Sequence, residues 1–207
     1  MQQNCSPDVK FYVRNLLLAV CLVFSGSAFS QDTASADTNH IYRSLPAALQ
    51  HPEDVRILDL SRTKLKEFPP DIVKLVNLRE LNLSKNKLSV LPPEIGRLVH
   101  LQKLVIASNR LKALPPEIGN LRALTFLGLN RNELESLPPE IGKLVKLEYL
   151  ELWDNEIGSL PEEISKLENL KEMELRGILF SDEEQQSIKA LLPNAIIHFS
   201  PSCNCKN

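Results

Sequence analysis

The feature that most constrains the fold is a six-residue stretch, LPPEIG, that occurs three times, at 91–96, 114–119 and 137–142. The three copies begin 23 residues apart, and the variants FPPDIV at 68–73 and LPEEIS at 160–165 keep the same interval. A fixed period of about 20–50 residues indicates a chain built from stacked units, each of which buries its apolar face against its neighbours. We therefore expect one continuous repeat domain.

Apolar residues fill the same positions of every unit. Three such positions, separated by three and then by two residues, hold Leu in every unit except at Val55, Ile106 and Met173. Apolar side chains two residues apart are typical of a short strand that buries alternate side chains. We therefore expect a strand at the start of each unit, in five full units over 55–169 and a partial sixth that begins at Leu170.

A polar column follows the strands. An Asn amide can both donate and accept hydrogen bonds where a turn leaves backbone groups without a strand partner. The column therefore predicts a buried ladder of side chains that runs along the stacked units. Its members are Thr63, Asn86, Asn109, Asn132 and Asn155.

The two prolines of LPPEIG explain why that stretch recurs. Proline cannot donate to a strand ladder and its φ is fixed, so Pro92 and Pro93 end the extended segment at a bend. Ile95 and Leu98 are three residues apart, which suits one short helical turn that faces the interior. We expect LPPEIG to form the side of each unit that lies opposite the strands.

With LxxLxLxxNxL and LPPEIGxLxxL on a 23-residue period, the chain resembles the leucine-rich repeat family over about residues 45–199. It is most similar to the short LPxxIGxLxxL subtype found in many exported bacterial proteins. The resemblance implies an α/β solenoid of horseshoe shape, with a concave parallel sheet and with short helices or 3-10 turns on the convex side. The repeats are expected to span 55–177.

Both ends of the repeat region depart from the pattern, as terminal units of repeat proteins do. At 41–54, apolar residues at Leu45 and Ala48 predict an N-terminal helical cap. At 178–199, Ser181 before three acidic residues is typical of a helix start, and AIIHF at 195–199 predicts a final strand. We expect these two elements to form a C-terminal cap that covers the open sheet edge, followed by a flexible tail at 200–207.

The first 30 residues have the pattern of a signal peptide. Lys10 and Arg14 precede the apolar run LLLAVCLVF, and Ala28 and Ser30 are small residues suited to cleavage before Gln31. The polar segment 31–40 is expected to be a flexible linker. Two alternatives are a buried or uncleaved N-terminal helix and a lipoprotein attached through Cys21. Export, to the medium or to the cell surface, is the preferred interpretation.

Composition and motifs indicate neither an enzyme nor a cofactor site. The net charge is only −2, which predicts no binding to nucleic acid. There is no Gly-rich phosphate loop, GxSxG or HExxH motif. The histidines lack a carboxylate or Cys at ligand spacing, so we expect no metal site. They are His40, His51, His100 and His198.

Two cysteines lie beyond the predicted signal peptide, in SPSCNCKN near the end of the chain. Cys203 and Cys205 can close a small strained ring, form an intermolecular bridge, or stay free. We expect neither to be a catalytic nucleophile, because too few residues follow the predicted helix to form a catalytic domain.

The strand residues between the buried Leu positions point away from the core and form the candidate contact surface. Aromatic residues on neighbouring units, rimmed by charge, are typical of binding hot spots; packing of these rings on one another is the simpler alternative. The third to fifth units provide most of this surface. The candidate partner-binding residues are Lys103, Val105, Phe126, Asn130, Arg131, Tyr149, Glu151, Trp153, Asp154, Glu172 and Glu174.

Charge is sorted along the repeats. The first three units together carry a net charge of about +7 and the fifth about −6, counted from the sequence. We expect a dipolar surface that orients a partner of opposite arrangement. The prominent basic residues are Arg56, Arg62, Arg79, Lys85, Lys87, Lys103 and Arg110.

These observations predict an exported, non-enzymatic leucine-rich repeat protein that binds host-cell or extracellular-matrix proteins through its concave face. Two alternatives stay open. The basic units can bind a polyanion such as a heparin-like glycan, which predicts strong salt dependence. The protein can also have a structural role in the cell envelope through self-association, with Cys203 and Cys205 as possible bridges.

Overall fold

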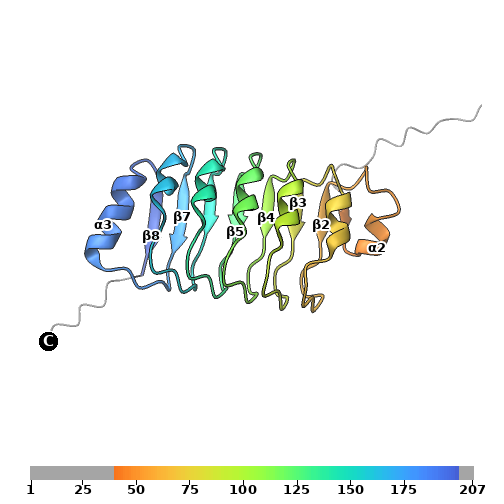
Figure 1. The fold of residues 1–207 in the computed structure, drawn as a ribbon, viewed down its shortest axis with the longest axis horizontal. Coiled ribbons are helices and arrows are strands. Elements are labelled where there is room, and N and C mark those ends of the chain that lie inside the picture. The colour runs from red at the N-terminus through yellow and green to blue at the C-terminus, as the bar shows by residue number, and fades with distance from the viewer. Residues whose placement is uncertain (1–39, 201–207) are drawn as a thin grey trace, which may run out of the picture. The chain divides into compact units, whose positions relative to one another are not determined.

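The computed structural model describes residues 40–200, which form a stack of coils around one apolar core (Figure 1). Eight parallel strands form one open sheet in chain order, so each strand pairs with the next along the sequence. The predicted strand at the start of each repeat is present. The strands are β1 (Ile41–Tyr42), β2 (Ile57–Asp59), β3 (Glu80–Asn82), β4 (Lys103–Val105), β5 (Phe126–Gly128), β6 (Tyr149–Glu151), β7 (Glu172–Leu175) and β8 (Ile196–Phe199).

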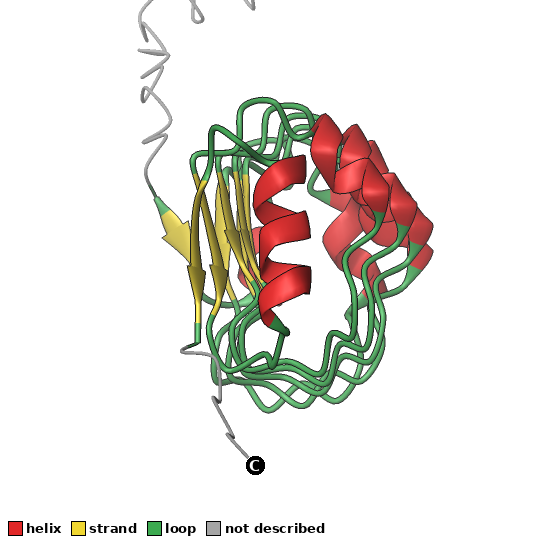
Figure 2. Ribbon diagram, turned by 90° about the vertical axis from the view of Figure 1, so that its left-hand side faces the viewer, coloured by secondary structure: helices red, strands yellow, loops and turns green. Residues whose placement is uncertain are grey.

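Five 3-10 helices form the side of the stack opposite the sheet, as Figure 2 shows in a view along the stack. Each begins directly after the proline that precedes it, and each buries one Ile against the core, as predicted for LPPEIG. The Leu columns of the strands fill the space between these two sides. The 3-10 helices are η1 (Pro70–Lys74), η2 (Pro93–Arg97), η3 (Pro116–Asn120), η4 (Pro139–Lys143) and η5 (Glu162–Lys166).

The predicted asparagine ladder is present, and Asn132 illustrates its geometry. Its Nδ2 donates to the carbonyl of Leu129 in its own coil at 2.8 Å and to that of Ile106 in the preceding coil at 3.0 Å. Its Oδ1 accepts from the amide of Leu111 at 3.1 Å. Asn86, Asn109 and Asn155 make the corresponding bonds. Each amide therefore joins two successive coils where strand pairing has ended.

The residue before each member of this ladder has a left-handed backbone. Positive φ at a residue other than glycine costs about 1–3 kcal/mol, so it persists only where surrounding contacts fix it. Here the ladder and the coil-to-coil backbone bonds fix the bend. In the last coil the position is taken by glycine, which adopts this conformation freely. The φ values are 59° at Arg62, 57° at Lys85, 57° at Ser108, 57° at Arg131, 60° at Asp154 and 79° at Gly177.

The glycine of LPPEIG allows neighbouring coils to approach closely. A Cβ built on Gly119 would lie 2.6 Å from the carbonyl oxygen of Glu140 in the next coil, which is too close for any side chain. Gly96 meets the carbonyl of Glu117 in the same way. The first unit has Val73 at this position, and its 3-10 helix packs less closely against the next one than the later ones do.

The ends of the stack carry helices, as expected. Helix α2 (Leu45–Ala48) follows β1, and helix α3 (Asp182–Leu191) precedes β8. Ser181 caps α3 through a capping box with Glu184, and Ile188 and Leu192 join the core. Whether these elements are required as caps stays a prediction. Within residues 40–200, no helix is both long and apolar enough to cross a membrane.

Two sequence predictions need adjustment or lie beyond the structure. Residues 41–54 were expected to form only a helical cap, whereas Ile41 and Tyr42 form β1 and extend the sheet beyond the first repeat. The predicted signal peptide at 1–30, the linker up to residue 39, Cys21, and the tail cysteines Cys203 and Cys205 lie outside the described residues.

We expect Asn132→Ala to lower the free energy of unfolding by about 2 kcal/mol or more. The change leaves buried backbone groups of two coils without their side-chain partner, and each such group costs about 1–3 kcal/mol. Urea unfolding followed by circular dichroism measures the loss. Asn120→Ala, at an exposed position of η3, is the control and should stay within about 0.5 kcal/mol of the wild type. Equal losses in both variants would contradict the role of the ladder.

We expect Gly119→Ala to destabilise the protein by about 1–3 kcal/mol, because its methyl group meets the backbone of the next coil and forces the coils apart. Gly158→Ala introduces the same methyl group at a position with no atom within 4 Å, so its unfolding free energy should match or slightly exceed that of the wild type. Thermal unfolding of the two variants measures the difference. A Gly119→Ala variant as stable as Gly158→Ala would show that close approach of the coils does not require glycine.

Candidate functional site

The outward side of the sheet, here called the sheet face, is the surface that carries the candidate contact residues. Parallel pairing aligns equivalent residues of successive strands, so the side chains lie in rows across the stack. One row runs Glu80, Lys103, Phe126, Tyr149, Glu172, and the next runs Asn82, Val105, Gly128, Glu151, Glu174. The rows predicted from the 23-residue period are therefore correct for β2 to β7.

The first row brings two predicted aromatic residues together. The ring centroids of Phe126 and Tyr149 lie 6.3 Å apart, and Tyr149 is 38% exposed. Cations lie on both sides of the pair: Lys103 Nζ is 5.3 Å from the Phe126 ring centroid and Lys171 Nζ is 6.0 Å from that of Tyr149. Lys171 is held by Glu148 at 2.7 Å. The result is a partly exposed apolar strip between basic side chains.

Trp153 lies at a separate position, just beyond the end of β6. The guanidinium carbon of Arg131 lies 4.7 Å from the Trp153 ring centroid, and Arg131 Nε is 3.7 Å from Asp154 Oδ2. These three predicted residues are therefore neighbours, but among residues 40–200 the aromatic contact of Tyr149 reaches Phe126 and not Trp153. Asn130 is only 8% exposed, so it offers a partner little surface.

Gly128 makes room for the aromatic strip. A Cβ at this position would lie 3.1 Å from the Phe126 ring and 3.4 Å from a methyl group of Val105. The Phe126 ring therefore leans over the glycine, and Val105 borders it on the other side.

The far end of the sheet face is acidic. Glu151, Glu172 and Glu174 lie on β6 and β7, and burial raises the pKa of Glu151 above its usual value, with further increases from Glu174 and Glu172. Lys103 acts in the opposite direction. Arg176 Nε donates to Glu174 Oε2 at 2.7 Å, and this carboxylate raises the pKa of the guanidinium.

The structure corrects the expectation that no histidine lies near carboxylates at ligand distance. His198, on β8, is next to Glu172 and Glu174 of β7, and His51 is next to Glu53 and Asp54 in an exposed loop. The first group joins two strands whose residues are 24 and 26 positions apart in the sequence. Spacing along the chain did not reveal it because a helix intervenes.

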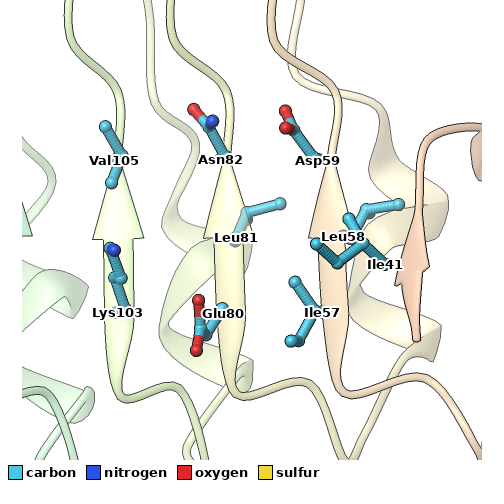
Figure 3. Close-up of a pocket in the computed structure, with 9 residues that line it drawn as sticks. All are labelled: Ile41, Ile57, Leu58, Asp59, Glu80, Leu81, Asn82, Lys103 and Val105. Atoms are coloured by element: carbon cyan, nitrogen blue, oxygen red, sulfur yellow. The ribbon is translucent and has the colours of Figure 1, made fainter. Parts of the chain in front are cut away.

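A second feature that the sequence did not reveal is a hollow of about 180 Å³ over β1 to β4. Figure 3 shows its lining: Ile57, Glu80 and Lys103 form one row, Asp59, Asn82 and Val105 form the next, and Ile41 of β1 closes one side. The hollow exists because β1 adds Ile41 to the sheet edge. It adjoins the aromatic strip through Lys103 and Val105.

The basic residues of the first three repeats are not gathered on the sheet face. Of the seven singled out above, only Lys103 occupies an outward strand position. Arg62 and Lys85 lie at the left-handed bends, and Arg56 and Arg79 lie before the strands. The charge gradient along the sequence therefore does not produce a basic sheet face: the outward charges near the N-terminal end are Asp59, Glu80 and Lys103.

We expect Glu151→Gln to stabilise the protein at neutral pH and to lose this advantage in acid. The raised pKa means that the folded state disfavours the ionised carboxylate, so wild-type stability falls as pH rises through the folded pKa. Below the ordinary value of 4.5, both forms are uncharged and the difference should vanish. Urea unfolding at pH 7 and pH 4 measures it. Glu135→Gln, on an exposed loop, is the control; the same pH-dependent gain there would remove the explanation by burial.

Comparison with known proteins identifies the fold family. A model of a leucine-rich repeat region matches residues 39–192. A leucine-rich repeat protein of Leptospira interrogans is 35% identical over 79% of this chain and 47% of its own, with a TM-score of 0.66. Among curated proteins, none matches at a significant level.

Two plant receptors are also similar. The ectodomain of the Arabidopsis thaliana receptor kinase GASSHO1/SCHENGEN3, in complex with CASPARIAN STRIP INTEGRITY FACTOR 2, is 32% identical over 70% of this chain and 18% of its own, with a TM-score of 0.58. The plant peptide hormone receptor RGFR1, in complex with RGF2, is 32% identical over 71% and 24%, with a TM-score of 0.61. This chain spans less than half the length of all three structures. It belongs to the leucine-rich repeat family.

Proposed function

We propose that this protein is an exported, non-enzymatic binding module that holds a protein partner on its sheet face, across β4 to β7. The observation that carries the proposal is the exposed strip of Phe126 and Tyr149 between basic side chains. These rings lie outside the core, so their burial remains available to a partner, and aromatic residues contribute strongly to binding hot spots.

The geometry of the face favours an extended segment of the partner. Eight strands about 4.8 Å apart extend over about 34 Å, which about ten extended residues can span. Such a segment would place an apolar side chain over Phe126 and Tyr149 and a cationic side chain near Glu151 and Glu172. The two plant receptors to which the chain is similar were solved in complex with CASPARIAN STRIP INTEGRITY FACTOR 2 and RGF2, which supports a protein or peptide partner by analogy.

The predicted signal peptide at 1–30 supports export, and the similarity to the short bacterial repeat subtype supports a partner outside the cell. We propose host-cell or extracellular-matrix proteins as that partner class, with the protein acting at the cell surface or after release. This part of the proposal depends on resemblance, because one fold serves many functions.

The two alternative functions make different predictions. Polyanion binding requires a continuous basic surface, and the best grouping is Arg56, Arg79 and His100 beside one another at the edge of the coils. It predicts binding that falls steeply with salt and does not depend on Tyr149. Self-association through Cys203 or Cys205 predicts a dimer that a reducing agent separates.

We expect Phe126→Ala/Tyr149→Ala to weaken partner binding by at least about tenfold, because the variant removes both rings of the proposed hot spot. The experiment is a surface plasmon resonance screen of the full chain against purified extracellular-matrix proteins, host-cell ectodomains and heparin. Each variant is first compared with the wild type by circular dichroism and thermal unfolding, so that loss of fold is not read as loss of binding.

Val90→Ala/Val145→Ala is the matched control. Both residues are exposed apolar side chains outside the strands, so this variant removes apolar surface without touching the sheet face. A partner that binds wild type and both variants equally would contradict the aromatic strip as the contact. Binding of heparin alone, unchanged in the aromatic variant, would favour the polyanion function.

A further inference from the structure

Two carboxylates and one imidazole converge at the C-terminal end of the sheet face. Glu172 and Glu174 belong to β7, and the parallel register places Glu174 directly beside His198 of β8. His198 Nε2 lies 3.0 Å from Glu172 Oε1 and 3.6 Å from Glu174 Oε1. One ligand atom from each residue lies within 4.8 Å of the other two. This is a compact donor set that joins two strands.

The distances match those between ligands of one metal ion. Ligands about 2.0–2.1 Å from a tetrahedral zinc ion lie about 3.3–3.4 Å from one another. The observed 3.0 Å and 3.6 Å lie on either side of this value. Small side-chain rotations would therefore bring all three atoms to bonding distance of one ion. One imidazole with two carboxylates suits zinc and similar transition metals, whereas calcium and magnesium prefer oxygen ligands alone.

Neighbouring side chains orient this donor set. Glu174 is only 13% exposed, and its Oε2 accepts a hydrogen bond from Arg176 Nε at 2.7 Å. This leaves Oε1 directed toward His198, and outer partners that fix a ligating carboxylate are typical of metal sites. Glu151 faces Glu174 from the next strand. The three carboxylates therefore exceed the single charge of Arg176, and a divalent cation would balance that excess.

We propose that Glu172, Glu174 and His198 bind one divalent transition-metal ion, with zinc as the best match, and leave its fourth position open. The proposal does not depend on the protein-binding function. A bound ion would connect β8 to the repeat sheet, and because it binds only the folded arrangement it would stabilise the protein. A role limited to a hydrogen bond between β7 and β8 predicts no effect of metal.

The experiment uses the untagged full chain with its four cysteines replaced by Ser, so that neither thiolates nor a polyhistidine tag bind metal. Isothermal titration with zinc chloride should give one ion per chain, and zinc should raise the thermal unfolding midpoint. Calcium at the same concentration should leave the midpoint unchanged. His198→Ala and Glu174→Gln should each weaken zinc binding by more than about tenfold.

His51→Ala is the matched control, since His51 belongs to the other histidine and carboxylate group, which is fully exposed. It should bind zinc as the parent chain does. Cobalt as a spectroscopic probe should give the visible absorption of tetrahedral coordination in the parent chain and in His51→Ala, and not in His198→Ala.

Three results would overturn the site: no zinc binding by the parent chain, binding unchanged in both His198→Ala and Glu174→Gln, or binding lost in His51→Ala instead. Glu174→Gln decides the question if circular dichroism shows that His198→Ala fails to fold, because it keeps the shape of the side chain. Loss of zinc binding with partner binding intact, or the reverse, distinguishes the failure of this proposal from that of the proposed function.

Discussion

The structure depends on the way each Asn amide satisfies the backbone where the strands end. Strand pairing covers only three or four residues per coil, and the bend that follows has polar backbone groups facing an apolar interior. Buried groups of this kind are costly unless they are paired. Asn132 and its equivalents pair them within a coil and to the preceding coil at once. This fixes the step between coils, and the left-handed residue before each Asn directs its side chain inward.

A fixed step between coils determines which side chains meet on the sheet face. Residues 23 positions apart become neighbours, so Phe126 stacks near Tyr149 and Glu151 faces Glu174. The interior is occupied by nearly identical Leu positions in every coil, and the individuality of the protein lies in the outward rows. The 3-10 helices contribute through Gly96 and Gly119, which allow close approach of the coils on the opposite side.

The period predicted the fold well wherever the step is 23, and it failed where the step changes. The strands β2 to β7, the asparagine ladder and the aromatic pair all follow from that interval. At the N-terminal end Ile41 pairs with Ile57, 16 residues on, and at the C-terminal end Glu174 pairs with His198, 24 residues on. The hollow beside Ile41 and the group around His198 both result from these irregular steps. Charge placement also escaped prediction, because a count along the sequence does not distinguish Lys103 on a strand from Arg62 at a bend.

The two proposals concern neighbouring parts of one surface, and electrostatics links them. Glu172 and Glu174 belong both to the acidic end of the proposed partner surface and to the proposed metal site. A cation bound there would cancel the negative charge that attracts a cationic side chain near Glu151 and Tyr149. Linkage then requires that the partner weaken metal binding by the same factor by which metal weakens the partner. A partner that instead supplies a carboxylate or imidazole to the open fourth position would reverse the sign, so the direction of this coupling reports the chemistry of the partner residue that reaches β7.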